Sequence, residues 1–307
     1  MHQSYMIASS LFSTTLTLPT PPDFSFWRTA HSHGWCDLPP FGFDKNKHTL
    51  FRLLNLKDGK VVHCTLRGSR REVTIDIQSS QKLTARQSIE ILDQLSHCLQ
   101  LSSDLTEFQR ESKRYPEFRW IAKARAGRLL RSPTVFEDVV KMICTTNCSW
   151  ALTEVMVERL TREFGERFNG SATFPEPEAI AVAQEKFIRK NIHAGYRSPY
   201  LIEFAQRVAS GDLDVESWIA SPLPTEELYE QVVSIKGVGE YAAGNILRLL
   251  GRHDYLALDS WLRGKFAELH YGGRKVSDRT IHRHYARFGK WKGLFLWLEA
   301  TKDWFDA

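Results

Sequence analysis

The residue of this sequence best placed to do chemistry is Asp259, which follows the apolar run 255–258 and precedes Ser260-Trp261-Leu262. Such an approach predicts a carboxylate delivered to the start of a helix, where Asp commonly serves as the N-cap. A carboxylate can also stabilise a sugar oxocarbenium ion or orient a water molecule that attacks it. The two roles are compatible, and we expect Asp259 to be the catalytic group.

A turn with two glycines, Lys236-Gly237-Val238-Gly239, lies about twenty residues before Asp259. It separates a predicted helix that ends at Val233 from one that starts at Gly239, so backbone N–H groups point outward at a positive helix end. Without a Cβ, glycine permits both the backbone angles of the turn and the close approach of a phosphate. The alternative is a simple corner between helices, which an isolated Gly-x-Gly more often marks.

The elements that must position these residues change in character along the chain. Runs rich in β-branched residues predict an antiparallel sheet with strands at 14–18, 49–56, 60–67 and 72–78, and Asp58-Gly59 marks a hairpin turn. Beyond Thr84 the apolar spacing becomes helical. The predicted helices cover residues 133–146, 150–164, 199–210, 225–233, 239–250, 260–270 and 277–288. We therefore predict an α+β fold.

The predicted organisation is a small N-terminal sheet domain, residues 1–104, followed by a larger all-helical domain, residues 105–307. The hairpin occupies about 226–250. With 42% hydrophobic and 25% charged residues in 307, the composition excludes a disordered chain. No apolar run approaches the ~20 residues that span a bilayer, so we expect no membrane partner.

Five scattered cysteines favour free thiols in a reducing compartment. The first twenty residues contain no Lys or Arg, which disfavours a secretory signal. We expect a cytoplasmic protein, in the nucleoid region of a bacterium or in the nucleus of a eukaryote.

Positive charge gathers toward the C-terminus. Residues 236–307 contain thirteen Lys and Arg against eight Asp and Glu, an excess of five that equals the net charge of the whole chain. A basic region beside a neutral remainder indicates a polyanionic partner, because binding would release counterions. Charge alone is equally consistent with a basic face that is simply solvated.

Together, the Gly-Val-Gly turn and Asp259 resemble the helix-hairpin-helix (HhH-GPD) DNA glycosylases. Residues 142–147, Glu158-Arg159-Leu160 and Gly195-Tyr196-Arg197 are similar to the corresponding segments of 8-oxoguanine DNA glycosylases. The resemblance covers residue 105 to the end, and the sheet more weakly. It implies a monomeric base excision repair enzyme that flips a damaged base out of double-stranded DNA and cleaves its N-glycosidic bond, leaving an abasic site.

One departure from that family concerns Tyr241. Bifunctional 8-oxoguanine glycosylases carry a lysine two residues after the second hairpin glycine, where its amine forms a Schiff base. Tyrosine cannot form an imine, which predicts a monofunctional glycosylase without lyase activity. An aromatic residue here is similar to the alkylated-base glycosylases, so we expect an alkylated purine as the substrate. Lys236 is a conceivable substitute nucleophile, but we expect it to face phosphate.

Two alternatives stay open. One is an 8-oxoguanine glycosylase that works without a Schiff base. The other is a DNA-binding module that cuts nothing, because hairpins of this type also serve as plain phosphate grips. Asp259 discriminates between the enzymes and the binding module.

Further site residues follow from the same resemblance. Asn147 matches the residue that fills the gap left by the flipped nucleotide, and its ordinary alternative is a helix C-cap. We expect Tyr241, Asn245 and Trp291 to line the base pocket, where flat aromatic surfaces stack on a base and attract a cationic one. Arg263 and Lys265 flank the helix of Asp259 and are predicted phosphate contacts. The segment 24–27 resembles one that reaches the base in 8-oxoguanine glycosylases, but Asp23 replaces their reading glycine.

No cofactor is needed for this chemistry. The resemblance implies a structural Na⁺ or K⁺ held by the main-chain carbonyls of Val233, Ile235 and Val238. A four-cysteine iron–sulfur cluster near the C-terminus is excluded, because no cysteine follows Cys148. His31-x-His33-x-x-Cys36 lacks a fourth zinc ligand, and we expect these three to be scattered surface residues.

Overall fold

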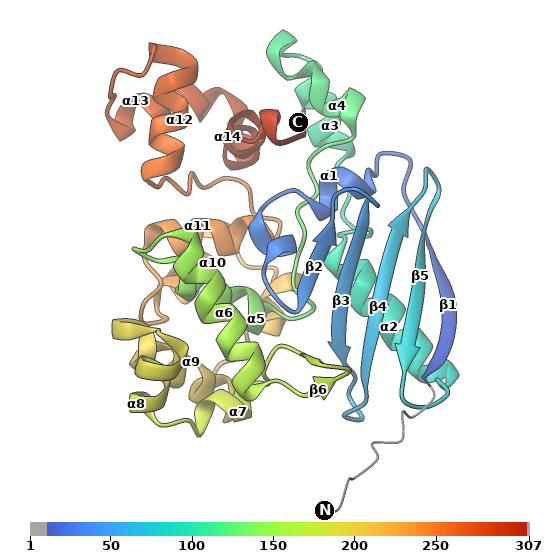
Figure 1. Cartoon of the computed structure of the whole chain (residues 1–307). Coiled ribbons are helices and arrows are strands. Elements are labelled where there is room, and N and C mark those ends of the chain that lie inside the picture. The colour runs from blue at the N-terminus through green and yellow to red at the C-terminus, as the bar shows by residue number, and fades with distance from the viewer. Residues whose placement is uncertain (1–10, 306–307) are drawn as a thin grey trace, which may run out of the picture.

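The structure is a computed structural model that describes residues 11–305: a five-stranded antiparallel sheet followed by a helical region (Figure 1). The predicted α+β class is confirmed. Residues 1–10, half of the segment used in the signal argument, lie outside the described residues. Within the described part, no helix has the length and apolar character needed to cross a membrane.

The sheet has the strand order β1-β5-β4-β3-β2. All four predicted strands are confirmed, with Gly59 at a φ of +78° in the predicted turn. Alternate residues of β5, namely Val73, Ile75 and Ile77, are fully buried, as period-2 patterning requires. The strands are β1 (Phe12–Pro19), β2 (Phe41–Asp44), β3 (Thr49–Asn55), β4 (Val61–Gly68) and β5 (Glu72–Ser79).

One face of the sheet is covered by α2 (Ala85–Cys98), which lies behind β4 and β5 in Figure 1. Thr84 and Gln87 form a capping box at its start, which satisfies two backbone donors that a helix otherwise leaves unpaired. Its buried residues include Ile91 and Leu95, both from the periodic pattern that predicted the helix.

The rest of the chain is mainly helical, and the seven helices predicted after residue 130 are confirmed to within a few residues. A short hairpin, β6 (Arg167–Phe168) and β7 (Ser171–Ala172), interrupts them. The remaining helices are α1 (Phe26–Ala30), α3 (Thr106–Ser112), α4 (Arg119–Ala124), α5 (Val135–Thr145), α6 (Trp150–Phe164), α7 (Pro177–Ala181), α8 (Glu185–Phe187), α9 (Ser198–Ala209), α10 (Thr225–Val233), α11 (Glu240–Leu249), α12 (Ser260–Tyr271), α13 (Asp278–Tyr285) and α14 (Lys292–Ala300).

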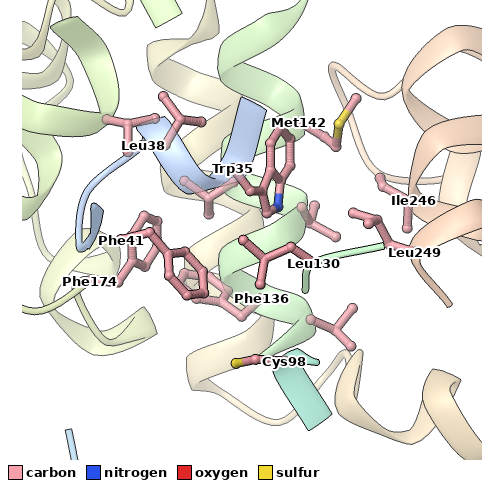
Figure 2. Close-up of a cluster of buried hydrophobic side chains, with 14 of the residues drawn as sticks. Trp35, Leu38, Phe41, Cys98, Leu130, Phe136, Met142, Phe174, Ile246 and Leu249 are labelled. Atoms are coloured by element: carbon pink, nitrogen blue, oxygen red, sulfur yellow. The ribbon is translucent and has the colours of Figure 1, made fainter. Parts of the chain in front are cut away.

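Two buried apolar clusters hold the molecule together. The larger runs from the sheet into α5, α9 and α11, so it includes residues on both sides of position 104, and the proposed domain division stays a prediction. Trp35 and Met142 lie together at one end of the part of this cluster drawn in Figure 2. The second cluster joins α3 and α4 to α12, α13 and α14, which lie together at the top of Figure 1.

Candidate active site

The predicted glycine turn joins α10 to α11. Gly237 has a φ of +89°, and a Cβ on it would lie 2.7 Å from a ring carbon of Tyr200, so glycine is required there. Gly239 has an ordinary φ of −93°, and a Cβ on it would meet nothing within 4 Å. The backbone angles therefore require glycine at Gly237 and not at Gly239, whose outer face is open.

Asp259 is brought to its place by a segment packed between α11 and α14. A Cβ on Gly244 of α11 would lie 2.9 Å from the Cβ of Ala257, and the amide of Gly293 donates to the carbonyl of His253 at 2.7 Å. Glycine at these two points lets the helices approach the segment closely. Asp259 then caps α12, with Oδ1 accepting from the amide of Leu262 at 2.7 Å, which confirms the predicted N-cap role.

Asp259 lines a cavity of about 820 Å³ between the two core clusters. A volume of this size suits a small organic ligand. Its walls come from residues far apart in the chain, among them Tyr241, Asn245 and Arg248 of α11. Five tryptophans contribute flat surfaces: Trp35, Trp150, Trp261, Trp297 and Trp304.

The Tyr241 hydroxyl lies in the electrostatic field of Asp259. Burial, and next the negative charge of Asp259, raise the pKa of the Tyr241 phenol to about 12. The phenol therefore stays protonated at neutral pH and is a hydrogen-bond donor beside the carboxylate. Tyr241 is thus confirmed as a residue of the cavity that holds Asp259.

Two of the tryptophans are fixed in orientation by hydrogen bonds. The indole Nε1 of Trp35 donates to Asp138 Oδ1 at 2.7 Å, and that of Trp297 donates to the carbonyl of Ser32 at 3.1 Å. Trp35 belongs to the 3₁₀ turn Gly34–Asp37, so the N-terminal part of the chain supplies one wall of the cavity. Trp35 was not among the site residues predicted from the sequence, because no periodic pattern marks it.

Arg248, one turn beyond Asn245 on α11, was also missed. Its side chain is only 3% exposed, and its guanidinium carbon lies 5.1 Å from the ring centre of Trp297. Nη1 donates to Asn245 Oδ1 at 3.0 Å, while Asn245 Nδ2 donates to the carbonyl of Tyr241 at 2.9 Å. Asn245 lines the cavity as predicted, with its amide held by two protein partners. The signal available in the sequence was an arginine within the apolar run Ile246–Leu250.

Trp291 does not line the cavity, and this prediction is wrong. Its ring packs on Phe108 at 5.2 Å and on His253 at 5.5 Å, within the second core cluster. Two tryptophans near the C-terminus do line the cavity, Trp304 and Trp297, and Trp297 lies on α14, which was not among the predicted helices.

The segment 24–27, which resembles one that reaches the base in 8-oxoguanine glycosylases, does not line the main cavity. It borders a separate cavity of about 340 Å³. Asp23 is held by Arg128, whose Nη1 and Nη2 each lie 3.1 Å from a carboxylate oxygen. Asp23 thus has a structural partner.

His31, His33 and Cys36 are not scattered surface residues, which corrects that expectation. His33 and Cys36 are buried, and His31 Nδ1 lies 3.4 Å from the Cys36 sulfur. His33 Nε2 lies 2.7 Å from the carbonyl of Leu130, and burial lowers the pKa of His33 to about 3. His33 is therefore neutral and fastens the turn that carries Trp35.

Asn147 is exposed at the joint between α5 and α6, in the left-handed region with a φ of +48°. Its Nδ2 lies 3.4 Å from the hydroxyl of Tyr196, which is 45% exposed. Arg197, itself buried, donates to the carbonyl of Thr146 and so clamps the joint. The structure thus places an aromatic side chain beside the predicted wedge residue.

Each of the three basic side chains predicted to contact phosphate forms an ion pair with a carboxylate. Lys236 Nζ lies 2.7 Å from Glu203, Arg263 binds Asp278 through two nitrogens at 2.8 and 2.9 Å, and Lys265 lies 3.4 Å from Asp303. All three pairs are at least partly exposed, so a phosphate can compete for the cations.

The carbonyls named for a monovalent cation lie at the hairpin, where the carbonyl of Ile235 accepts from the amide of Val238 at 3.0 Å. A carbonyl oxygen has a second lone pair, so this turn bond leaves Ile235 able to be a ligand. Val233, Ile235 and Val238 remain a prediction as a cation site.

Residues 140–294 match the profile of the HhH-GPD superfamily of base excision DNA repair proteins, about half of the chain. The chain belongs to this superfamily. Among curated proteins, the chain is 24% identical over 208 residues to a probable N-glycosylase/DNA lyase of Methanothermobacter thermautotrophicus, covering 59% of this chain and 65% of that protein. It is 26% identical over 129 residues to a putative DNA-3-methyladenine glycosylase of Bacillus subtilis, covering 41% and 43%. The matches thus span less than two thirds of either relative.

Solved structures superpose on almost the whole of this chain. A 3-methyladenine DNA glycosylase from Archaeoglobus fulgidus superposes with a TM-score of 0.74 at 22% identity, over 95% of this chain and 99% of that one. An 8-oxoguanine glycosylase/lyase of Clostridium acetobutylicum, bound to double-stranded DNA, gives 0.72 at 18% identity, over 97% and 99%. At these identities the likeness shows the fold.

Proposed function

We propose that this HhH-GPD protein is a monofunctional DNA glycosylase, which hydrolyses the N-glycosidic bond of a damaged base flipped out of duplex DNA. The observation that carries the proposal is Asp259 on the wall of a cavity with room for a flipped base, with Tyr241 at the position where the resemblance implies the lysine of bifunctional enzymes. The open outer face of Gly239 and the basic C-terminal region support DNA as the partner.

In the proposed reaction, the hairpin grips one strand by phosphate while Asn147 and the exposed Tyr196 enter the gap in the duplex. The Asp259 carboxylate stabilises positive charge on the sugar as the bond to the base breaks, and it orients the attacking water. Because the Tyr241 phenol stays protonated, it can donate a hydrogen bond within the site but offers no nucleophilic amine. The product is an abasic site.

The five tryptophans of the cavity are compatible with any stacked base, and they would attract an electron-poor alkylated purine most strongly. An alkylated purine is therefore the substrate that the sequence resemblance and the aromatic walls support.

The experiment uses duplexes that each contain one 7-methylguanine, one hypoxanthine or one 8-oxoguanine. We expect strand breaks only after hot alkali, which cleaves abasic sites, and no protein–DNA adduct with borohydride. Breaks without alkali together with an adduct would contradict a monofunctional enzyme. In that case Lys45, a lysine that lines the cavity, is the amine to test by Lys45→Ala.

The non-catalytic alternative predicts a different result in the same assay. A binding module releases no base from any of the three duplexes, although it retains affinity for them. The 8-oxoguanine alternative predicts release from that duplex first, with breaks that still depend on alkali.

A further inference from the structure

Two histidines and a glutamate from three different helices lie together outside the cavity that holds Asp259. His270 is in the last turn of α12, His284 is near the end of α13, and Glu299 is in α14. Each side chain offers one ligand atom, and the three atoms lie within 4.8 Å of one another. In the part of the chain that the structure describes, no other three His, Cys, Asp or Glu side chains are grouped as closely.

The spacing of these atoms fits a four-coordinate metal ion. His270 Nε2 lies 3.2 Å from Glu299 Oε2. Two ligand atoms bound to one tetrahedral zinc ion are about 3.4 Å apart, so this pair already has the separation that the ion requires. The ring centres of His270 and His284 are 4.4 Å apart. A histidine ring turns easily about its last torsion angle, which allows His284 to complete the site.

The group has donor atoms that the protein leaves free, and it can be reached from solvent. The His284 imidazole has no hydrogen-bond partner among the described residues, and either nitrogen of such a ring can bind a metal. Glu299 uses Oε2 for its contacts with His270 and with the hydroxyl of Tyr285, so Oε1 is available. The side chains of His270 and Glu299 are 23% and 16% exposed, which gives an ion a path that needs no unfolding.

The chemistry of the donors selects the metal. Two imidazole nitrogens with one carboxylate form a set that zinc uses, with a water molecule in the fourth position. Mg²⁺ and Ca²⁺ prefer oxygen ligands, and two of the three donors here are nitrogen. We propose that His270, His284 and Glu299 form a zinc site. Tyr285 supports it by donating a hydrogen bond to Glu299, because such an outer partner fixes the orientation of a ligating carboxylate.

The role of this site is structural and does not depend on the proposed glycosylase function. α12 begins at Asp259, and His270 lies eleven residues further, about 16 Å along the helix axis. The ion therefore does not touch a base in the cavity. It connects α12, α13 and α14, which are otherwise held together by the second core cluster. Since the unfolded chain has no preformed site, zinc binding stabilises this three-helix unit.

The first test titrates ZnCl₂ into the full chain, without a histidine tag and stripped with EDTA, in a calorimeter. We expect one ion per chain, and an affinity at least about tenfold weaker for His270→Ala and for Glu299→Gln. Glutamine keeps an oxygen that can accept from Tyr285, so this variant removes the charge with little change in packing. His282→Ala is the matched control, because His282 is exposed on α13 and lies outside the group.

Three results of the titration would overturn the proposal. One is the absence of zinc binding by wild type, which would leave His270 and Glu299 as an ordinary ion pair. Another is equal affinity of wild type and both variants, which would place the ion elsewhere. The third is an equal loss in His282→Ala, which would indicate binding by surface histidines in general.

The second test uses wild type alone, so it does not depend on whether a variant folds. Co²⁺ in place of zinc should give the intense visible absorption of a four-coordinate ion, and one equivalent of Zn²⁺ should abolish it. Saturating Zn²⁺ should raise the midpoint of thermal unfolding by about 3–8 °C. The weak absorption of six-coordinate cobalt, or an unchanged midpoint, would overturn a zinc site that links the three helices.

Discussion

Under the proposed function, the side chain at position 241 decides between hydrolysis and lyase chemistry. Tyr241 lines the same cavity as Asp259, at the position where the sequence resemblance implies a lysine in bifunctional enzymes, and burial with the charge of Asp259 keeps its phenol protonated. Under the proposed function, a phenol at position 241 leaves hydrolysis by water as the route, because it offers no amine for a Schiff base.

This claim predicts that Tyr241→Lys installs lyase chemistry. An amine on the same face of α11 as Asn245 and Arg248 would reach the sugar that Asp259 faces, and burial would lower its pKa toward the nucleophilic form. We expect a borohydride-trapped adduct with lesion DNA, which wild type does not give. A folded, DNA-binding Tyr241→Lys protein that yields no adduct would show that this position does not reach the sugar.

Among single residues, the sequence predicted those that lie at a set distance from the glycine turn and missed those that do not. Asp259, Tyr241 and Asn245 follow from their distance to the glycine turn, and all three line the cavity. Nothing in the sequence distinguishes Trp291 from Trp297 as a residue of the cavity. The difference comes from the position of α14: Trp291, just before this helix, packs into the core, whereas Trp297 on the helix lines the cavity. Arg248 counted only as surface charge.

The two glycines of the hairpin between α10 and α11 meet different requirements. Gly237 is constrained by its positive φ and by Tyr200, whereas Gly239 has ordinary angles and open surroundings. The first glycine therefore serves the fold, and we infer that the second serves the approach of a phosphate to the start of α11.

The two positions form a matched pair for mutation. Gly237→Ala should lower the free energy of unfolding by about 1–3 kcal/mol, because a Cβ would be strained and crowded there. Gly239→Ala should leave stability within about 0.5 kcal/mol of wild type and weaken DNA binding several-fold. Urea unfolding and fluorescence anisotropy measure the two effects. Equal affinity of Gly239→Ala and wild type would argue against phosphate binding at the turn.

Elements with a strong period were predictable, and the short ones were not. The four predicted strands, α6 and α10 were placed within two residues, because alternating or helical apolar spacing continues over their whole length. β2 has only four residues and includes Gly42, so pairing with β3 defines it rather than its own pattern. The 3₁₀ turn that carries Trp35 likewise depends on contacts with α5.

Across the whole molecule, a buried ionic cluster joins the sheet to the helical region. Glu137 of α5 binds Arg52 of β3 at 2.7 Å and Lys141 of its own helix at 2.7 Å, and all three side chains are at most 4% exposed. The neighbouring Asp138 holds Trp35. The same helix thus connects the sheet, the core and one wall of the cavity.

Stability should therefore depend on pH through Glu137. Burial alone would raise its pKa, but Arg52 and Lys141 lower it to about 2. A depressed pKa contributes stability that is complete above the unfolded value near 4.5 and is lost as the pH falls toward 2. We expect Glu137→Gln to be less stable than wild type at pH 6, by roughly 3–5 kcal/mol, with a smaller difference at pH 3. Urea unfolding at both pH values checks this, and a constant difference would contradict it.

The central claim is that the Asp259 carboxylate does the chemistry, and Asp259→Asn tests it most directly. Asparagine is as good an N-cap as aspartate, so α12 should remain intact. We measure single-turnover base release and DNA affinity together on the duplex that wild type cleaves fastest. The account predicts at least a roughly 100-fold slower release with affinity equal to or tighter than that of wild type. Release at the wild-type rate by Asp259→Asn would contradict it.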